Sequence, residues 1–257
     1  MREYLEAEHP IRMAHRGSRL LWPENTAIAI EGAISLGLKY VETDVRVSVD
    51  GVAMLFHDAH LGRTTNATGK IAHWFAEDLE QLDTAYWFEP DLGYPLRGKG
   101  SGMLTLVEAL QRYPDTYFNI DLKSDTAAWA VSAAIDATGA HDRVLIGSFF
   151  DSRLRRFRRV TRNRVASSAG PQETLAMWTA SRLGRTLSGA PDAYQVPEVF
   201  NGLKVVDRRF VDACHQADKQ VHVWTVNGAE AMRRLLDIGV DGIVTDRPDL
   251  LNEVLHG

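Results

Sequence analysis

The chain has 257 residues, of which 45% are hydrophobic and 25% are charged, and its formal net charge is −5. This composition is typical of a globular protein with enough apolar residues to bury a core. The negative charge argues against a nucleic-acid-binding protein, which usually carries a basic excess. The length fits one large domain, and α/β barrels commonly have about 250 residues.

The cysteine content and the hydropathy pattern restrict the chain further. A single cysteine, Cys214, excludes an intramolecular disulfide and a thiolate metal cluster. Cys214 shares a helical face with Phe210 and Val211, which favours a structural role for it. The first ten residues contain no apolar run of the signal-peptide type, and the chain contains no stretch of about 18 apolar residues. We therefore expect a cytoplasmic protein with no integral membrane segment.

Short apolar runs alternate with amphipathic stretches along the chain. In chain order, strands are expected at 11–15, 39–44, 116–122, 143–148, 164–167, 193–196, 220–226 and 242–245. Helices are expected at 25–36, 104–113, 126–138, 152–160, 173–183, 207–217 and 229–238, with a last helix after Pro248. Such alternation implies a parallel sheet covered by helices, and about eight units predict a (β/α)₈ TIM barrel. A doubly wound open sheet is the alternative.

One segment interrupts the alternation. Residues 45–56 predict a β-hairpin, because Asp50-Gly51 between alternating apolar runs is a strong turn signal. Residues 58–103 then lack clear periodicity and are too long for a plain loop, so we expect a small insertion over the C-terminal mouth of the barrel. Residues 1–257 as a whole are expected to form a single domain. The arginine-rich run 153–164 is interpreted as a solvated helix face.

The first polar cluster, His15-Arg16-Gly17, falls at the end of the first expected strand. Catalytic groups of barrels come from these strand ends. His15 can exchange a proton near neutral pH, and Arg16 can hold an anionic oxygen. A structural histidine is the alternative. Downstream, Asn25 or Thr26 is expected to cap a helix, and Glu24 is a further candidate for the site.

Glu42 and Asp44 form a second cluster at the end of the second expected strand. Side chains two positions apart on a strand point to the same face. Two carboxylates so close repel each other, and a divalent cation such as Mg²⁺ or Ca²⁺ would remove the conflict. An exposed acidic edge is the alternative interpretation.

Further polar residues lie where the hairpin ends and on the third expected strand, at 116–122. His57 supplies a second imidazole where the hairpin returns, and two imidazoles can serve as the acid and the base in phosphodiester cleavage. Asn119, Asp121 and Lys123 share one face of a strand, where Asp121 offers another oxygen ligand and Lys123 a positive charge for a phosphate.

In order and spacing, these motifs resemble the glycerophosphodiester phosphodiesterases, a family of the phospholipase-C-like barrel superfamily. The resembling segments are 15–17, 23–26, 42–45, 50–51, 57–58, 61, 63–65, 69, 104–106, 108, 119–123, 223–227, 239–242 and 245–248. They extend over most of the chain, and together they are highly specific. The resemblance implies a (β/α)₈ barrel with a small insertion after the hairpin.

The resemblance also implies a divalent cation held by Glu42, Asp44 and Asp121. Mg²⁺ and Ca²⁺ are the expected ions, with Mn²⁺ as a further candidate. The family usually has glutamate where this chain has Asp121. Aspartate is one methylene group shorter, so the affinity for the metal and the preference among metals are open at this position.

The remaining roles follow from the same resemblance. His15 and His57 are implied as the acid–base pair, Arg16 and Lys123 as phosphate-binding residues, and Trp224 as the aromatic residue that lines the glycerol pocket. For Trp224, packing in the barrel core is the alternative. Which histidine is the acid and which is the base is not decided by the sequence.

The expected function is metal-dependent hydrolysis of a small-molecule glycerophosphodiester to sn-glycerol 3-phosphate and an alcohol. Two alternatives remain. The first is a lysophospholipase D-like enzyme acting on lipid headgroup esters, with an apolar channel from Trp74, Phe75, Trp87 and Phe88. These four aromatic residues can equally form a small core for the insertion. The second alternative is a non-catalytic barrel that binds glycerol phosphates. The oligomeric state is left open.

Overall fold

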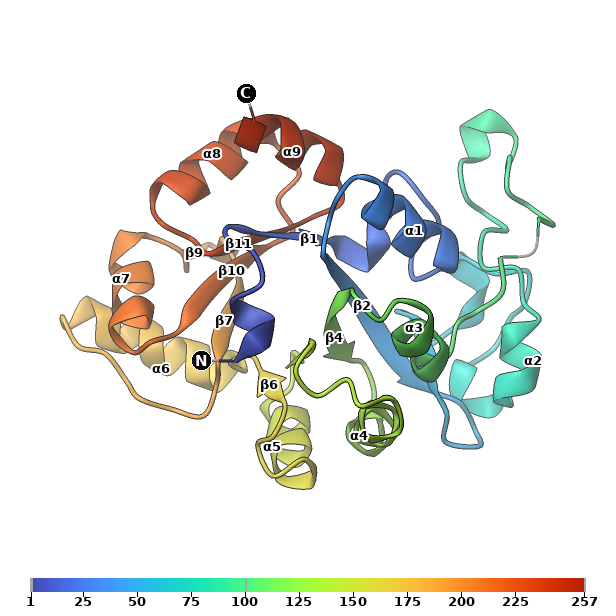
Figure 1. Ribbon diagram of the computed structural model, residues 1–257, viewed down its shortest axis with the longest axis horizontal. Coiled ribbons are helices and arrows are strands. Elements are labelled where there is room, and N and C mark those ends of the chain that lie inside the picture. Colours follow the sequence, from blue (N-terminus) through green and yellow to red (C-terminus); the bar gives the residue numbers. More distant parts are fainter. Residues whose placement is uncertain (1, 100, 257) are drawn as a thin grey trace.

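The computed structural model describes residues 2–99 and 101–256. Eight parallel strands form one sheet in the order β6-β5-β4-β2-β1-β11-β10-β7 (Figure 1). They are β1 (Ile11–Ala14), β2 (Tyr40–Val47), β4 (Tyr117–Leu122), β5 (Val144–Gly147), β6 (Ala166–Ser167), β7 (Ala193–Pro197), β10 (Gln220–Trp224) and β11 (Gly242–Thr245). A parallel bridge between Ser168 and Ala193 joins the two end strands. The expected TIM barrel is thus confirmed, and the open-sheet alternative is wrong.

Helices follow the strands and surround the barrel (Figure 1). They are α1 (Ala27–Ser35), α3 (Leu106–Arg112), α4 (Ala127–Thr138), α5 (Asp151–Val160), α6 (Pro171–Arg182), α7 (Arg208–Gln216), α8 (Ala229–Asp237) and α9 (Pro248–His256). The hydroxyl of Thr26 accepts the Ala29 N–H at 3.2 Å, so Thr26 is the N-cap of α1. Cys214 is buried on α7 beside Phe210 and Val211, as expected for a structural cysteine. None of the helices in the described part of the chain combines the length and hydrophobicity that a membrane span requires.

The hairpin is formed by β2 and the antiparallel strand β3 (Ala53–Leu55). Gly51 has a φ of +88° in its turn, a conformation that favours glycine. The expected break between a strand ending at 44 and a hairpin arm starting at 45 is wrong. β2 is continuous, because its first part pairs with β4 and its last part pairs with β3.

The insertion between 58 and 103 contains the 3₁₀ helices η3 (Leu61–Arg63), η4 (Ile71–His73) and η5 (Pro90–Leu92), and the short helix α2 (Ala76–Glu80). It shares a small apolar core with the hairpin, in which Met54 and Phe56 pack on Leu61, Ile71, Ala76, Leu79, Leu82 and Met103. The insertion therefore has its own packing and lies beside the β2–β3 hairpin, on the flank of the barrel (Figure 1).

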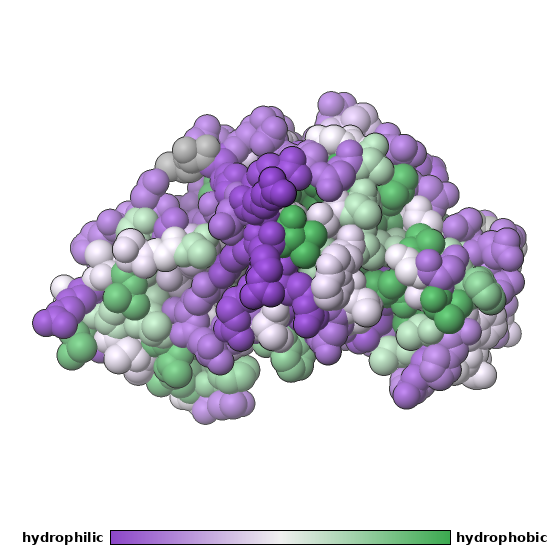
Figure 2. Space-filling model, turned by 90° about the horizontal axis from the view of Figure 1, so that it is seen from below, coloured by the Kyte–Doolittle hydropathy of each residue, from purple (hydrophilic) through white to green (hydrophobic). Residues whose placement is uncertain are grey.

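The arginine-rich helix α5 forms part of a hydrophilic band on the molecular surface (Figure 2). Arg155 and Arg159 of α5 are exposed, as expected for a solvated face. Arg158 is the exception. It is buried, and its guanidinium donates to Glu173 of α6 at 2.6 and 3.0 Å, so this residue fastens α5 to α6.

The N-terminal end of the barrel is closed by η1 (Glu3–Leu5). Tyr4 is fully buried and packs edge-on against Tyr40 and Tyr117, which begin β2 and β4. The Tyr40 hydroxyl donates to the Tyr4 carbonyl oxygen at 2.6 Å. With this end filled, the C-terminal ends of the strands are left to form the open mouth of the barrel.

Candidate active site

A cavity of about 630 Å³ opens at the C-terminal ends of the strands. It is lined by residues at the strand ends and by the loops that follow them, as in other barrels of this type. The eight residues to which the sequence analysis assigned a catalytic, metal-binding or substrate-binding role all line it: His15, Arg16, Glu42, Asp44, His57, Asp121, Lys123 and Trp224. The fold thus brings together side chains that lie up to 209 positions apart, counted from His15 to Trp224.

His15 follows β1 and is oriented by Asp246, which follows β11. The two strands pair with Ala14 opposite Thr245, so the next residue of each lies side by side. His15 Nδ1 is 2.7 Å from Asp246 Oδ1. Burial lowers the pKa of His15, but the hydrogen bond to Asp246 and the charge of Glu42 outweigh it and leave that pKa raised. His15 Nε2 lies 3.9 Å from Glu42 Oε2 and remains available for proton transfer.

Asp246 is a site residue to which the sequence analysis gave no role. It is fully buried, and Arg19 Nε (3.1 Å) and Asn227 Nδ2 (2.9 Å) also donate to its carboxylate. Burial raises its pKa, but these donors and His15 outweigh that effect and lower the pKa to about 2. Asp246 is therefore an anion that fixes the His15 ring. Its place directly after the last strand is the sequence signal that could have identified it.

His57 follows β3 and has the same kind of support. Its Nδ1 lies 2.6 Å from Asp58 Oδ1, and Arg63 donates to the other oxygen of that carboxylate. The His57 carbonyl oxygen accepts a hydrogen bond from Arg46 Nε at 2.8 Å, which holds the backbone in place. Each imidazole is thus fixed through Nδ1 and leaves Nε2 free.

Glu42 and Asp44 are buried side by side on β2, as their spacing predicts. Burial and the charge of Asp44 raise the pKa of Glu42 to about 7. Burial acts in the same direction on Asp44, but the cations Lys123 and Arg16 outweigh it and hold its pKa below the usual range. Asp44 is therefore ionised, whereas a negative charge on Glu42 is poorly stabilised without a further cation.

Arg16 bridges the carboxylates at the mouth. Its Nε lies 3.1 Å from Asp44 Oδ2, and its Nη1 donates to Glu24 at 3.0 Å. Glu24 also accepts from Arg63 at 2.8 and 2.6 Å, so it holds Arg16 from behind and does not line the cavity. Gly17 allows this arrangement, because a Cβ there would lie 2.6 Å from the Ala29 side chain and its φ is +75°.

Lys123 lies between two carboxylates. Its Nζ is 3.0 Å from Asp44 Oδ1 and donates to Asp121 as well. Both carboxylates raise the pKa of Lys123, although burial opposes them. With the ammonium group in this place, no three acidic, histidine or cysteine side chains among residues 2–99 and 101–256 are arranged to hold a metal ion as they stand.

Two buried oxygen atoms near Lys123 nevertheless have the chemistry of cation ligands. Asp121 Oδ1 and Asn119 Oδ1 are buried and find no hydrogen-bond partner among the described residues. Burial also raises the pKa of Asp121, as it raises that of Glu42. A hard divalent cation would satisfy these oxygens and stabilise both carboxylates as anions. The donor set therefore suits such an ion.

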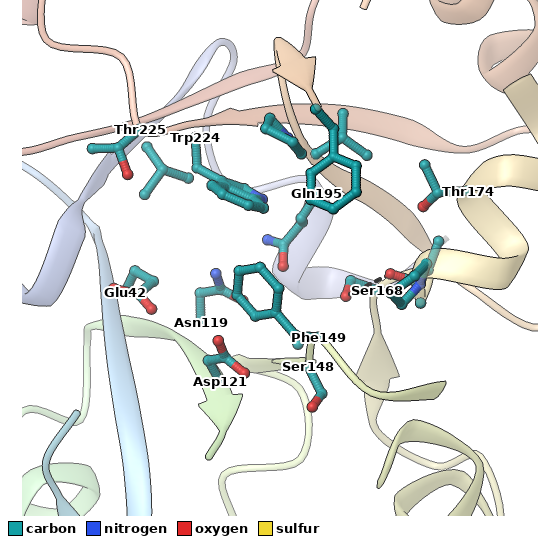
Figure 3. A pocket seen from close by; sticks show the side chains of 18 of the residues that line it. Glu42, Asn119, Asp121, Ser148, Phe149, Ser168, Thr174, Gln195, Trp224 and Thr225 are labelled. Carbon is teal, nitrogen blue, oxygen red and sulfur yellow. Dashed lines mark hydrogen bonds between the residues drawn. The ribbon is translucent and has the colours of Figure 1, made fainter. Parts of the chain in front are cut away.

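Trp224 lies at the end of β10 and faces Phe149, with ring centroids 5.2 Å apart. In Figure 3 the two rings separate Glu42 and Asp121 on one side of the cavity from Ser168 and Thr174 on the other. Trp224 lines the cavity and also packs against the barrel core. The four aromatic residues of the insertion proposed as an apolar channel do not line the cavity, and Trp74 packs against the insertion's own core.

This arrangement defines the class of site: a barrel mouth with two fixed imidazoles, buried carboxylates and cationic side chains, suited to acid–base chemistry on an anionic ester. Residues 15–250 match the model of the glycerophosphoryl diester phosphodiesterase family. The chain is 39% identical over 259 aligned residues to a Mycobacterium tuberculosis protein named "Probable glycerophosphodiester phosphodiesterase 2", with 98% of this chain and 93% of that protein covered. The chain belongs to this family.

Solved structures agree with the fold. A glycerophosphodiester phosphodiesterase from Agrobacterium tumefaciens superposes with a TM-score of 0.75 at 25% identity, over 94% of this chain and 98% of that one. A phosphodiesterase from Oleispira antarctica, solved in complex with its product sn-glycerol-3-phosphate, superposes with a TM-score of 0.79 at 24% identity, over 97% and 98% of the two chains.

Proposed function

We propose that this protein hydrolyses glycerophosphodiesters to sn-glycerol 3-phosphate and an alcohol, with His15 and His57 as the acid–base pair. The observation that carries the proposal is the matched support of the two imidazoles. Each has Nδ1 within 2.7 Å of a carboxylate oxygen, and both line one cavity. Family membership supports the same activity.

In the proposed reaction, one imidazole takes a proton from the attacking hydroxyl group, and the other gives a proton to the departing alkoxide. A new P–O bond forms to the nucleophile as the P–O bond to the alcohol breaks. The nucleophile is water or the neighbouring glycerol hydroxyl, whose cyclic product water then opens. The Nδ1 contacts to Asp246 and Asp58 keep each ring in one orientation, so that Nε2 is the atom that exchanges protons.

Arg16 and Lys123 are proposed to attract the phosphate. Both cations line the cavity, and both are already held by carboxylates, so they are positioned before a substrate binds. Trp224 is proposed to pack on the carbon atoms of the glycerol, next to the cations. Its half-buried ring lines the cavity and contacts Phe149, which supports this role.

Glu42, Asp44 and Asp121 are proposed to hold a divalent cation, Mg²⁺ or Ca²⁺, with Mn²⁺ as a further candidate. The unpartnered oxygen of Asp121 and the raised pKa of Glu42 support this assignment. When bound, such an ion neutralises charge on the phosphate oxygens. Because the side chain of Asp121 is shorter than that of glutamate, titration of the protein with each ion is needed to determine which one it prefers.

The test is the alanine substitution of either histidine. His15→Ala and His57→Ala are each expected to lower kcat/KM for glycerophosphocholine by roughly 10²- to 10⁴-fold, because each removes one proton-transfer group. His73→Ala, an exposed histidine of the insertion, serves as the control and should be as active as the unchanged protein. Turnover near the wild-type rate in either site variant would refute the scheme.

The same assay separates the enzyme from a non-catalytic glycerol-phosphate-binding barrel. Release of glycerol 3-phosphate is measured with EDTA and then with Mg²⁺, Ca²⁺ or Mn²⁺ added back. Binding of glycerol 3-phosphate without turnover under every metal would favour the binding protein.

A further inference from the structure

The cavity continues past Trp224 and Phe149 along an apolar wall. Its lining there comes from α6, from β7 and from a small hairpin formed by β8 (Val199–Phe200) and β9 (Leu203–Lys204). The side chains that define this wall are Leu175, Trp178, Val196, Phe200, Leu203 and Val205. Four of the six are aliphatic, so the wall offers a surface for hydrocarbon.

Several of these side chains are exposed to solvent although they are large and apolar. Leu175 is 59% exposed, Phe200 is 55% exposed and Leu203 is 40% exposed. They contribute little to the folded core, so the folding of the barrel does not explain them. A contiguous exposed apolar surface that borders a polar site usually marks a place where a ligand binds.

The wall is fixed before any ligand arrives. Trp178 Nε1 donates to the Lys204 carbonyl oxygen at 3.1 Å, which ties α6 to the β8–β9 hairpin. Leu175 and Trp178 are three positions apart and therefore lie on one face of α6. Such a surface loses little conformational entropy when an apolar group settles on it.

Charge is divided between the two sides of the cavity. Every charged residue in its lining lies between His15 and Lys123, on the side of the histidines. Among the described residues that line it, α6, β7 and the hairpin contribute none. Figure 3 shows the same division, with Glu42 and Asp121 on one side of the Trp224 and Phe149 rings and α6 on the other.

We propose that the preferred substrate is a phosphodiester that carries an aliphatic chain. The chain lies along the wall of α6 and the β8–β9 hairpin, while the phosphate lies between His15 and His57. This inference rests on the proposed phosphodiesterase function and names its substrate class. The reaction stays the same: water or the neighbouring glycerol hydroxyl gives a proton to one imidazole and bonds to phosphorus, the bond to the alcohol breaks, and the alkoxide takes a proton from the other imidazole. Water then opens the cyclic product where one forms.

The experiment measures kcat/KM against chain length in two series of monomeric substrates, below their critical micelle concentrations. In one series the chain is an acyl group on the glycerol of glycerophosphocholine. In the other it is the departing alcohol of a glycerol phosphate alkyl ester. In one of the two, we expect kcat/KM to rise by on the order of 100-fold over the first four methylene groups, as burial of each methylene predicts. The series that rises identifies where the chain is attached.

Variants locate the effect on the wall. Leu175→Ser and Phe200→Ser replace exposed side chains and should lower the ratio of kcat/KM for the longest substrate to that for glycerophosphocholine by about tenfold. Leu183→Ser is the matched control, because Leu183 follows α6, is 67% exposed and does not line the cavity. It should leave the ratio unchanged.

The outcomes separate this inference from the proposed function. If glycerophosphocholine is cleaved and neither series depends on chain length, the aliphatic substrate is refuted and the phosphodiesterase stands. If the wall instead forms an interface between two copies of the chain, sedimentation will show a dimer that Leu175→Ser dissociates, and the inference is also refuted. If no substrate is cleaved with any divalent metal, the proposed function itself fails.

Discussion

The imidazole of His15 is positioned by one buried anion at the other end of the chain. Asp246 holds His15 Nδ1 at 2.7 Å and itself stays ionised, with a pKa of about 2. Folding therefore raises the affinity of His15 for a proton despite its burial. Protonated His15 therefore stabilises the folded protein. This stabilisation is complete below the unfolded pKa of His15 and is lost as the pH rises through its folded pKa.

Asp246→Asn tests this coupling. Without the negative charge, burial dominates and the pKa of His15 should fall, as followed by NMR titration of its ring protons in metal-free protein. The limb of the pH–rate profile that reports His15 should move to lower pH, whichever proton transfer the residue performs. Asp249→Asn, whose carboxylate pairs with Arg247, is the control and should leave the His15 titration unchanged. An unaltered His15 pKa in Asp246→Asn would show that Asp246 does not tune it.

At the scale of elements, the start of α3 supports the strand that leads to His57. Thr105 caps α3: its hydroxyl accepts the Glu108 N–H at 3.1 Å, and the Glu108 carboxylate accepts the Thr105 N–H at 2.9 Å. Thr105 also bridges to Met54 of β3. The cap thus joins the start of a helix to the hairpin strand at Met54, three residues before His57.

Thr105→Ala should lower the free energy of unfolding by about 1 kcal/mol, as loss of an N-cap hydrogen bond predicts. Urea unfolding followed by circular dichroism measures it. Thr179→Ala, on the exposed face of α6, removes a hydroxyl that bonds only to a helical carbonyl oxygen and should change the stability by less than roughly 0.5 kcal/mol. Equal effects of the two substitutions would argue against the cap.

Much of the architecture could be predicted because its signals are local. The alternation of apolar runs predicted the eight barrel strands, and β11 at 242–245 agrees to the residue. The β8–β9 hairpin was missed because its strands are two residues long, although Asn201-Gly202 at its turn is a recognised hairpin signal. The pairing of His15 with Asp246 depends on the register of β1 against β11, which no local pattern specifies.

At the scale of the whole molecule, the buried acids at the barrel mouth lie close enough together for a bound cation to increase the stability of the folded protein. Glu42, Asp44 and Asp121 lie on β2 and β4, whose registers put Asp44 opposite Asp121. An ion that binds these oxygens in the folded state, and not in the unfolded chain, stabilises the fold.

Titration with Mg²⁺, Ca²⁺ or Mn²⁺ should therefore raise the thermal midpoint. At 100 times the dissociation constant the gain is about 2.7 kcal/mol, or roughly 5–10 °C for a chain of this size. Asp121→Asn should reduce this shift, whereas Asp212→Asn, on the exposed side of α7, should preserve it. A midpoint that no ion raises at millimolar concentration would exclude the proposed metal ligands.

The central claim is that the two imidazoles of this mouth cleave a glycerophosphodiester on the alcohol side of phosphorus. The direct measurement is ³¹P NMR of glycerophosphocholine incubated with the metal-supplemented protein in ¹⁸O-labelled water. The account predicts that the diester signal is replaced by glycerol 3-phosphate carrying ¹⁸O on phosphorus, and that His57→Ala shows almost none of it. Phosphocholine as the phosphorus-containing product, or an unchanged diester signal with every metal, would contradict it.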